Sequence, residues 1–116
     1  MKCCEPPKKT RGDFKRQARI HRALGNEARL LIVHSLNKCE CSVGELAEAV
    51  ALDISTVSKH LSVLLGCGIV DNRKDGNTVL YRLLTPCIFD MFNCTNNVLG
   101  IKVDAARKPN NKNIRR

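Results

Sequence analysis

The chain has 116 residues, a length that fits one domain with a modest hydrophobic core. It contains no Trp, one Tyr and three Phe, so the core must be aliphatic, which favours helices over a sandwich of strands. The formal net charge is +9, but residues 1–13 and 101–116 carry most of it and residues 14–100 are nearly balanced. Overall basicity therefore does not by itself establish nucleic-acid binding.

No apolar run approaches the roughly 20 residues that a membrane span needs, and the N-terminus lacks the apolar segment of a secretion signal. We therefore expect a cytoplasmic protein with no membrane partner. Seven cysteines are many for a compartment that keeps thiols reduced, and their odd number does not suit a closed disulfide framework. Free thiols in this number favour soft-metal binding or redox chemistry.

The first half of the chain predicts three helices. We expect residues 1–13 to form a flexible basic arm. Apolar residues at helical spacing predict helices over 14–24 and 27–36, the second of them capped by Asn26. After a loop, a Ser-x-x-Glu capping box predicts a third helix over 43–50.

The second half predicts a polar-faced helix, a hairpin and a last helix. An inward apolar stripe predicts the fourth helix over 54–66. Alternating apolar residues on either side of an Asp-Gly turn predict a hairpin over 69–83. Thr85 is expected to cap a helix over 86–99, and residues 101–116 to form a flexible basic tail.

This order of elements is typical of a winged helix-turn-helix, a mostly helical α+β fold. We expect one domain over residues 14–100. The helices over 43–50 and 54–66 form its turn motif, and the hairpin is its wing.

A recognition helix needs short hydrogen-bonding side chains near its N-terminus and a positive charge for phosphate. The helix over 54–66 presents such residues outward, and the hairpin adds basic and amide side chains. A solvated helix face has a similar composition, but the capped helix before it and the hairpin after it favour DNA reading. The candidate DNA-binding residues are Ser55, Thr56, Ser58, Lys59, His60, Ser62, Arg73, Lys74, Asn77 and Arg82.

The segments LGNEARLLIVHSL, CSVGELAEAVALDISTVSKHLSVLLGCGIV and DNRKDGNTVLYRL resemble the ArsR/SmtB family of metal- and metalloid-responsive repressors. The resemblance covers roughly residues 14–99. It implies a homodimer that pairs through its first and last helices, binds double-stranded operator DNA, and releases it when an inducer binds.

In the arsenic and cadmium/lead sensors of that family, a Cys-x-Cys pair lies directly before an acidic-Leu-Ala triplet, which here is residues 45–47. This chain carries Cys39 and Cys41 three residues upstream, in the predicted loop, so the pair is displaced. The family's zinc sensors use Asp and His on the last helix. That helix has Asp90 but no His, which argues against the zinc type.

Two groupings of thiols stay open as the inducer site. The first joins the two loop thiols to two thiols of the N-terminal arm, and the second uses two thiols of the last helix. Those two lie about 10.5 Å apart along the helix axis, whereas sulfurs on one ion lie within about 4.6 Å, so they meet only across a dimer with antiparallel last helices. Apolar packing is the alternative role for this second pair. The candidates are Cys39, Cys41, Cys3 and Cys4 for the first grouping, and Cys87 and Cys94 for the second.

Three thiolates suit As(III) or Sb(III), which we expect as the inducer, with no organic cofactor. A Cd(II)/Pb(II) sensor and a thiol redox or persulfide switch are the alternatives within the same fold. A thiol enzyme such as an arsenate reductase would need Cys-x-x-Cys or a nucleophilic Cys in an anion-binding loop, and a structural zinc module would also use Cys-x-x-Cys spacing. The sequence contains neither pattern, so we predict a protein that is not an enzyme.

Overall fold

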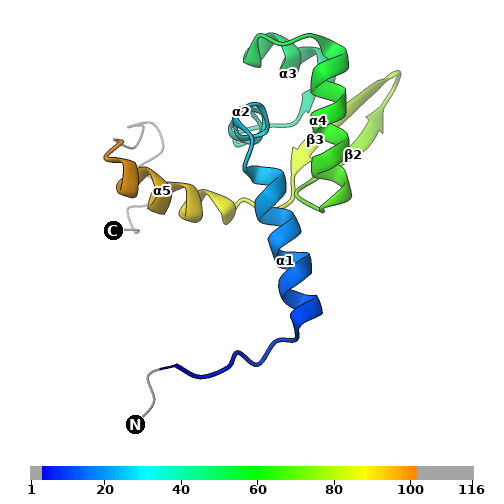
Figure 1. Cartoon of the computed structure of the whole chain (residues 1–116). Helices are drawn as coiled ribbons and strands as arrows, with labels where there is room; N and C mark the ends of the chain where they lie inside the picture. Colours follow the sequence, from blue (N-terminus) through cyan, green and yellow to red (C-terminus); the bar gives the residue numbers. More distant parts are fainter. Residues whose placement is uncertain (1–3, 102–116) are drawn as a thin grey trace. The chain divides into compact units, whose positions relative to one another are not determined.

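The computed structural model of the chain describes residues 4–101. The fold is a winged helix-turn-helix, as predicted (Figure 1). The chain divides into two units, one ending at Leu84 and the other beginning at Thr85. The first unit contains α1 (Arg11–Leu24), α2 (Glu27–Ser35), β1 (Cys41–Ser42), α3 (Val43–Val50), α4 (Ile54–Gly66), β2 (Val70–Asp75) and β3 (Thr78–Leu83), and the second contains α5 (Ile88–Leu99).

The helix-turn-helix consists of α3 and α4, whose axes differ by 109°. The predicted capping box at the start of α3 is confirmed. The Ser42 hydroxyl accepts a hydrogen bond from the Glu45 amide at 3.1 Å, and the Glu45 carboxylate accepts one from the Ser42 amide at 2.8 Å. Helix α3 ends at Ala51, which adopts the left-handed conformation with φ of 60° and directs the chain into α4.

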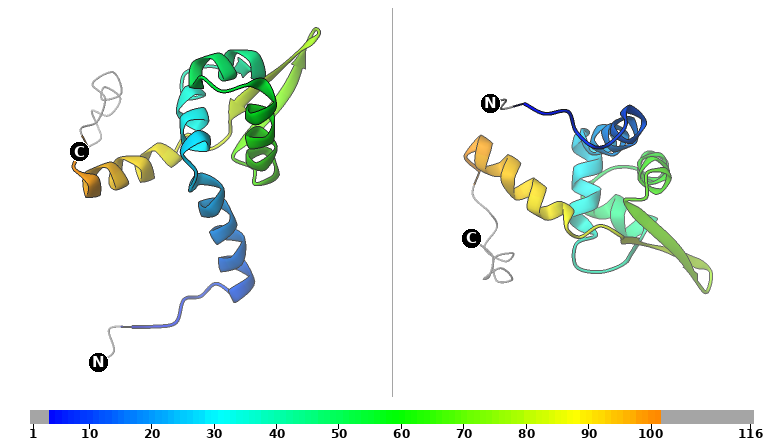
Figure 2. Two further views of the ribbon diagram at one scale, coloured as in Figure 1. Left: turned by 45° about the horizontal axis from the view of Figure 1, so that its top comes forward. Right: turned by 90° about the horizontal axis from the view of Figure 1, so that it is seen from below.

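The wing is part of a three-stranded antiparallel sheet with the strand order β1-β3-β2. The predicted hairpin is confirmed as β2 and β3. It extends beyond the helices of the first unit (Figures 1 and 2). Gly76, with φ of 67°, begins the two-residue loop between the paired residues Asp75 and Thr78. Strand β1 was not predicted, because two residues are too few to show alternation.

The core of the first unit is aliphatic. The inward stripe predicted for α4 is largely confirmed, since Val57, Leu61 and Leu64 are fully buried. The predicted apolar faces of the first two helices are only partly buried. Ile20 on α1 and Leu31 on α2 remain 37% and 47% exposed.

Helix α1 begins at Arg11, three residues earlier than the apolar spacing predicted. Thr10 and Asp13 form a capping box that sets the start of the helix ahead of its first apolar residue, Phe14. The last three residues of the expected N-terminal arm are therefore helical.

Helix α5 begins at Ile88, two residues later than predicted, and Thr85 is not its cap. The segment before it forms a turn in which the Ile88 amide donates to the Thr85 carbonyl at 3.0 Å. Cys87 occupies the N-cap position instead. The rings of Phe89 and Phe92 pack edge to face at 5.4 Å within this helix.

Among residues 4–101, no single helix combines the length and apolar composition needed to cross a membrane. Helices α3 and α4 meet that test only when they are joined across their bend.

Candidate nucleic-acid interface and thiol pair

The outward face of α4 carries four exposed polar residues. Because Val57, Leu61 and Leu64 of α4 are buried, the polar residues on the opposite side of the helix face solvent. Two further predicted residues are only half-exposed at the edge of this face. The exposed residues are Ser55, Ser58, Lys59 and Ser62, and the half-exposed ones are Thr56 and His60.

The start of α4 is organised around Asp53. Its backbone is extended, as an N-cap requires, but its side chain makes no capping bond to the helix. Its carboxylate instead accepts a hydrogen bond from the Ser55 hydroxyl at 2.9 Å. The hydroxyls of Thr56 and Ser55 hold the pKa of Asp53 below its ordinary value. The hydroxyl proton of Ser55 is thus used in a hydrogen bond within the chain, and the hydroxyl oxygen remains available to accept a hydrogen bond.

His60 is held from the core side of α4. Its Nδ1 lies 3.2 Å from Nη1 of Arg29 on α2, and Nε of the same arginine donates to the Ala23 carbonyl at 2.6 Å. Because arginine only donates, this Nδ1 must act as the acceptor. Only Nε2 of the imidazole is then left for a contact with DNA.

Each of the two wing arginines is paired with a carboxylate. Nη2 of Arg73 lies 2.6 Å from Oε1 of Glu40, and Nε of Arg73 lies 3.1 Å from each oxygen of the same carboxylate. Arg82 and Asp71 make a looser pair at 3.5 Å. The Arg73 guanidinium also lowers the pKa of Glu40, chiefly through its hydrogen bonds. The remaining predicted wing residues, Lys74 and Asn77, are exposed toward the tip of the hairpin.

Cys41 lies in β1 and not in a free loop. It pairs with Tyr81 of β3. Its thiol donates to the Cys39 carbonyl at 3.6 Å, and its Sγ lies 4.0 Å from the Ser35 carbonyl. Burial, followed by the neighbouring Cys39, raises the pKa of Cys41 to about 11. Its thiol is therefore protonated at neutral pH.

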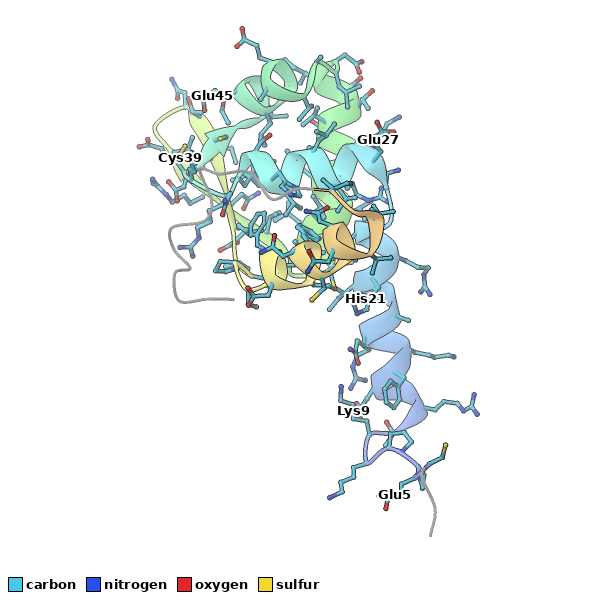
Figure 3. All side chains as sticks on the ribbon, turned by 90° about the vertical axis from the view of Figure 1, so that its left-hand side faces the viewer. Glu5, Lys9, His21, Glu27, Cys39 and Glu45 are labelled. Atoms are coloured by element: carbon cyan, nitrogen blue, oxygen red, sulfur yellow. The ribbon has the colours of Figure 1, made fainter. Side chains whose placement is uncertain are left out.

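Cys39, which Figure 3 labels, is exposed on the segment that leads into β1. Cys4 is also exposed, whereas Cys3 lies outside the described residues. In the second unit, Cys87 and Cys94 are both exposed. Within residues 4–101 no group of three or more His, Cys, Asp or Glu side chains is placed to hold a metal ion. A three-thiolate site built from the described residues alone therefore needs either a movement of the chain or a second copy.

No sequence pattern indicated three residues that pair with the predicted site residues: Glu40, Asp71 and Arg29. Their partners lie 33, 11 and 31 positions away along the chain. Only the pairing of β1 with β3 could have indicated Glu40 as a neighbour of the wing, and β1 leaves no pattern in the sequence.

A helix-turn-helix followed by a hairpin matches a known family of regulators. Residues 26–72 match the family described as bacterial regulatory protein, arsR family. The nodulation protein NolR of Rhizobium meliloti is 35% identical over 86 residues, which cover 74% of this chain and 70% of NolR. The chain belongs to the ArsR family.

Similar proteins and solved structures agree with this membership. The crystal structure of NolR from Sinorhizobium fredii superposes with a TM-score of 0.71 at 31% identity, covering 88% of this chain and 100% of that one. A homodimeric winged helix-turn-helix DNA-binding domain from Mycobacterium bovis gives a TM-score of 0.68 at 26% identity, covering 82% and 91%. The biofilm growth-associated repressor of Xylella fastidiosa is 35% identical over 81 residues, which cover 66% of this chain and 71% of that protein. This ArsR-family chain is a DNA-binding transcriptional regulator and not an enzyme.

Proposed function

We propose that this ArsR-family regulator is a cytoplasmic homodimeric repressor that leaves its operator when a thiophilic inducer binds its cysteine thiolates. As(III) or Sb(III) is the proposed inducer. The observation that carries the proposal is the position of Cys39 and Cys41, one beside and one within the sheet whose other two strands form the wing. A ligand held by these thiols acts on the same sheet that meets DNA.

The polar face of α4 supports the DNA-binding half of the proposal. Ser55, Ser58 and Ser62 offer short hydrogen-bonding groups for base edges in the major groove, and Lys59 offers a charge for phosphate. Lys74 and Asn77 at the tip of the wing are proposed to contact the neighbouring backbone. Thr56, His60, Arg73 and Arg82 are proposed as contacts of the same surface that are also held by, or packed against, neighbouring groups.

Exposed apolar side chains on the first and last helices support pairing of two copies. On α1, Phe14 and Ile20 are 40% and 37% exposed, and on α5 Val98 and Leu99 are 85% and 69% exposed. Large exposed apolar side chains mark interaction sites when they gather on one element. The Mycobacterium bovis relative is described as a homodimer, which agrees with this reading. Two-fold pairing would present two copies of α4 to a near-palindromic operator.

The donor chemistry of the thiol pair fits a soft ion. Cys39 and Cys41 are thiols two residues apart, and each would lose a proton on binding. We propose that the arm supplies the third thiolate, from Cys4 or from Cys3. Cd(II) or Pb(II) with four thiolates, and oxidation to a disulfide or persulfide, remain the alternative inducers.

The second candidate site uses Cys87 and Cys94. Both are exposed, and α5 exposes apolar residues suited to a dimer contact. If two copies of α5 cross antiparallel, Cys87 of one copy approaches Cys94 of the other. An ion held there would bind across the interface that sets the spacing of the two recognition helices.

The experiment titrates reduced protein on its operator with arsenite, Cd(II), Pb(II), Zn(II) or a polysulfide and follows DNA release by fluorescence anisotropy. We expect arsenite to release DNA and Cys39→Ser or Cys41→Ser to abolish release. If only Cys87→Ser and Cys94→Ser abolish it, the interface site is correct. Release from a variant with every cysteine replaced by serine, or failure of the native protein to hold duplex DNA, refutes the proposal.

The two basic ends complete the proposal. We propose that the basic residues in segments 1–10 and 101–116 act as arms that strengthen DNA binding by the domain between them, which begins with α1 at Arg11. Deleting either arm should lower affinity equally for operator and random duplex, and should flatten the dependence of binding on salt.

A further inference from the structure

We propose that Glu40 is a positioning residue for the wing arginine Arg73, and that it couples the Cys39–Cys41 segment to the DNA-contacting surface of the wing. The positioning itself stands on the ion pair in the first unit. The coupling rests on the proposed function, because it assumes that the thiol pair is where the inducer binds.

The geometry of the pair leaves Arg73 able to bind DNA while Glu40 holds it. Glu40 occupies the edge of the guanidinium formed by Nε and Nη2, at 2.6 to 3.1 Å. A guanidinium has five N–H donors, and the two on Nη1 are not used by Glu40. The Arg73 side chain remains 53% exposed. A two-point contact on one edge fixes the plane of the guanidinium and leaves the other edge for a phosphate.

The sheet explains how Glu40 reaches Arg73. Ser42 of β1 lies opposite Leu80 of β3, and Leu80 lies opposite Arg73 of β2, so these three residues share one face of the sheet. Because side chains alternate along an extended chain, Glu40 lies on the same face as Ser42. Its carboxylate therefore crosses β3 to meet Arg73. The pair joins the segment before α3 to β2, the first strand of the hairpin.

Glu40 lies between the two thiols, which makes its position sensitive to them. Cys41 on one side is fixed by its pairing with Tyr81 of β3, whereas Cys39 on the other side is exposed and outside the sheet. A ligand that draws the Cys39 sulfur toward the Cys41 sulfur must change the backbone on the Cys39 side of Glu40. An exposed ion pair is weak compared with capture of an ion by two thiolates, so the pair yields first. Arg73 then loses the support that fixes its plane.

The second arginine of the wing provides a matched control. Asp71 pairs with Arg82, and the two residues lie opposite each other in β2 and β3. This pair is on the same sheet but lies wholly within the hairpin. Breaking it removes a carboxylate from the wing, as breaking the Glu40 pair does, but leaves the hydrogen bonds between Glu40 and Arg73 in place. Arg82 lies close enough to Glu40 to help lower its pKa, so this control matches the loss of a wing carboxylate and keeps the link itself.

The first test uses reduced protein without any inducer. We measure the hydrogen-exchange rate of the Arg73 Nε–H group by NMR in the native protein and in the Glu40→Gln and Asp71→Asn variants. We expect exchange at least fivefold faster in Glu40→Gln than in the native protein, and a rate within twofold of native in Asp71→Asn. Equal rates in the native protein and Glu40→Gln overturn the positioning role, whatever the inducer proves to be.

The second test measures coupling as the ratio of the operator Kd with saturating arsenite to the Kd without it. We expect Glu40→Gln and Arg73→Lys each to lower this ratio at least fivefold toward one, and Asp71→Asn to keep it within twofold of native. Arsenite binding, followed by the loss of titratable thiols, should persist in all three variants. Combining Glu40→Gln with Arg73→Lys should lower the ratio no further than either alone, because both remove the same link.

The outcomes separate the two proposals. If Glu40→Gln binds arsenite and keeps the native ratio, the coupling is refuted while the thiol sensor stands. If native protein gives a ratio of one, or if Cys39→Ser with Cys41→Ser leaves the native ratio unchanged, the proposed thiol sensor fails. The exchange measurement alone then decides whether Glu40 positions Arg73.

Discussion

Cys41 of β1 lies directly opposite Tyr81 of β3, and the pairing continues at Ser42 and Leu80. The second thiol of the Cys-Glu-Cys segment is therefore part of the sheet, whereas Cys39 is exposed outside it. This difference separates two chemically identical groups. One thiol is accessible, and the other is half-buried and donates to a backbone carbonyl.

The first prediction concerns thiol reactivity. Iodoacetamide reacts with thiolates, and a pKa of about 11 leaves roughly 10⁻⁴ of Cys41 as thiolate at pH 7. We expect Cys41 to be alkylated at least tenfold more slowly than Cys39 at pH 7, measured by peptide mass spectrometry. Because the pKa is raised, the Cys41 rate should continue to rise up to about pH 11. In urea the two rates should become similar, and equal rates in the folded protein would contradict the burial of Cys41.

The second prediction distinguishes two kinds of DNA contact on α4. Lys59→Ala should weaken binding equally for operator and random duplex and reduce the slope of log Kd against log salt by about 2 for the dimer, because it removes one phosphate contact from each of the two copies of α4. Ser58→Ala should reduce the preference for operator and leave the slope unchanged. Both side chains are exposed, so neither change should affect folding. A changed slope in Ser58→Ala alone would reverse the assigned roles.

The third prediction concerns the connection between α2 and α4. Arg29 bonds to the Ala23 carbonyl and to His60, and both bonds involve a charged donor. Arg29→Met should lower the free energy of unfolding by about 2 kcal/mol, measured by urea denaturation. Arg22→Met, at an exposed position of α1, is the matched control and should change stability by less than about 0.5 kcal/mol. A similar loss in both variants would mean that the Arg29 contacts contribute little.

The fourth prediction compares the effect of an alanine-to-glycine substitution on stability at Ala51 and at Ala49. Ala51 has φ of 60°, where an L-residue is strained and glycine is not, so Ala51→Gly should raise stability by roughly 0.5 kcal/mol. Ala49 lies in α3, where glycine is unfavourable, so Ala49→Gly should lower stability by about 1 kcal/mol. Thermal unfolding of the two variants should show shifts of opposite sign. A loss of stability in both would show that Ala51 is not strained in solution.

Some features of the candidate site depend on residues close together in the chain, and others depend on residues far apart in the chain. The capping box at Ser42 and the inward stripe of α4 could be predicted because a cap spans four residues and a helical stripe repeats every three or four. The boundary of α5 could not. Thr85 followed by proline has the pattern of a helix start, but the chain there forms a turn, with Cys87 in the N-cap position.

The sequence by itself determined the order of the helices and of the wing hairpin, the winged helix-turn-helix and the polar face of α4, because each depends on residues close together in the chain. The tertiary structure decided which of the predicted DNA-binding side chains are paired with another residue of the chain. It placed Glu40 against Arg73 and Arg29 against His60, and it put Cys41 into a sheet. The physical reason is that each of these three contacts joins residues 30 or more positions apart, and a partner at that distance leaves no periodic pattern in the sequence.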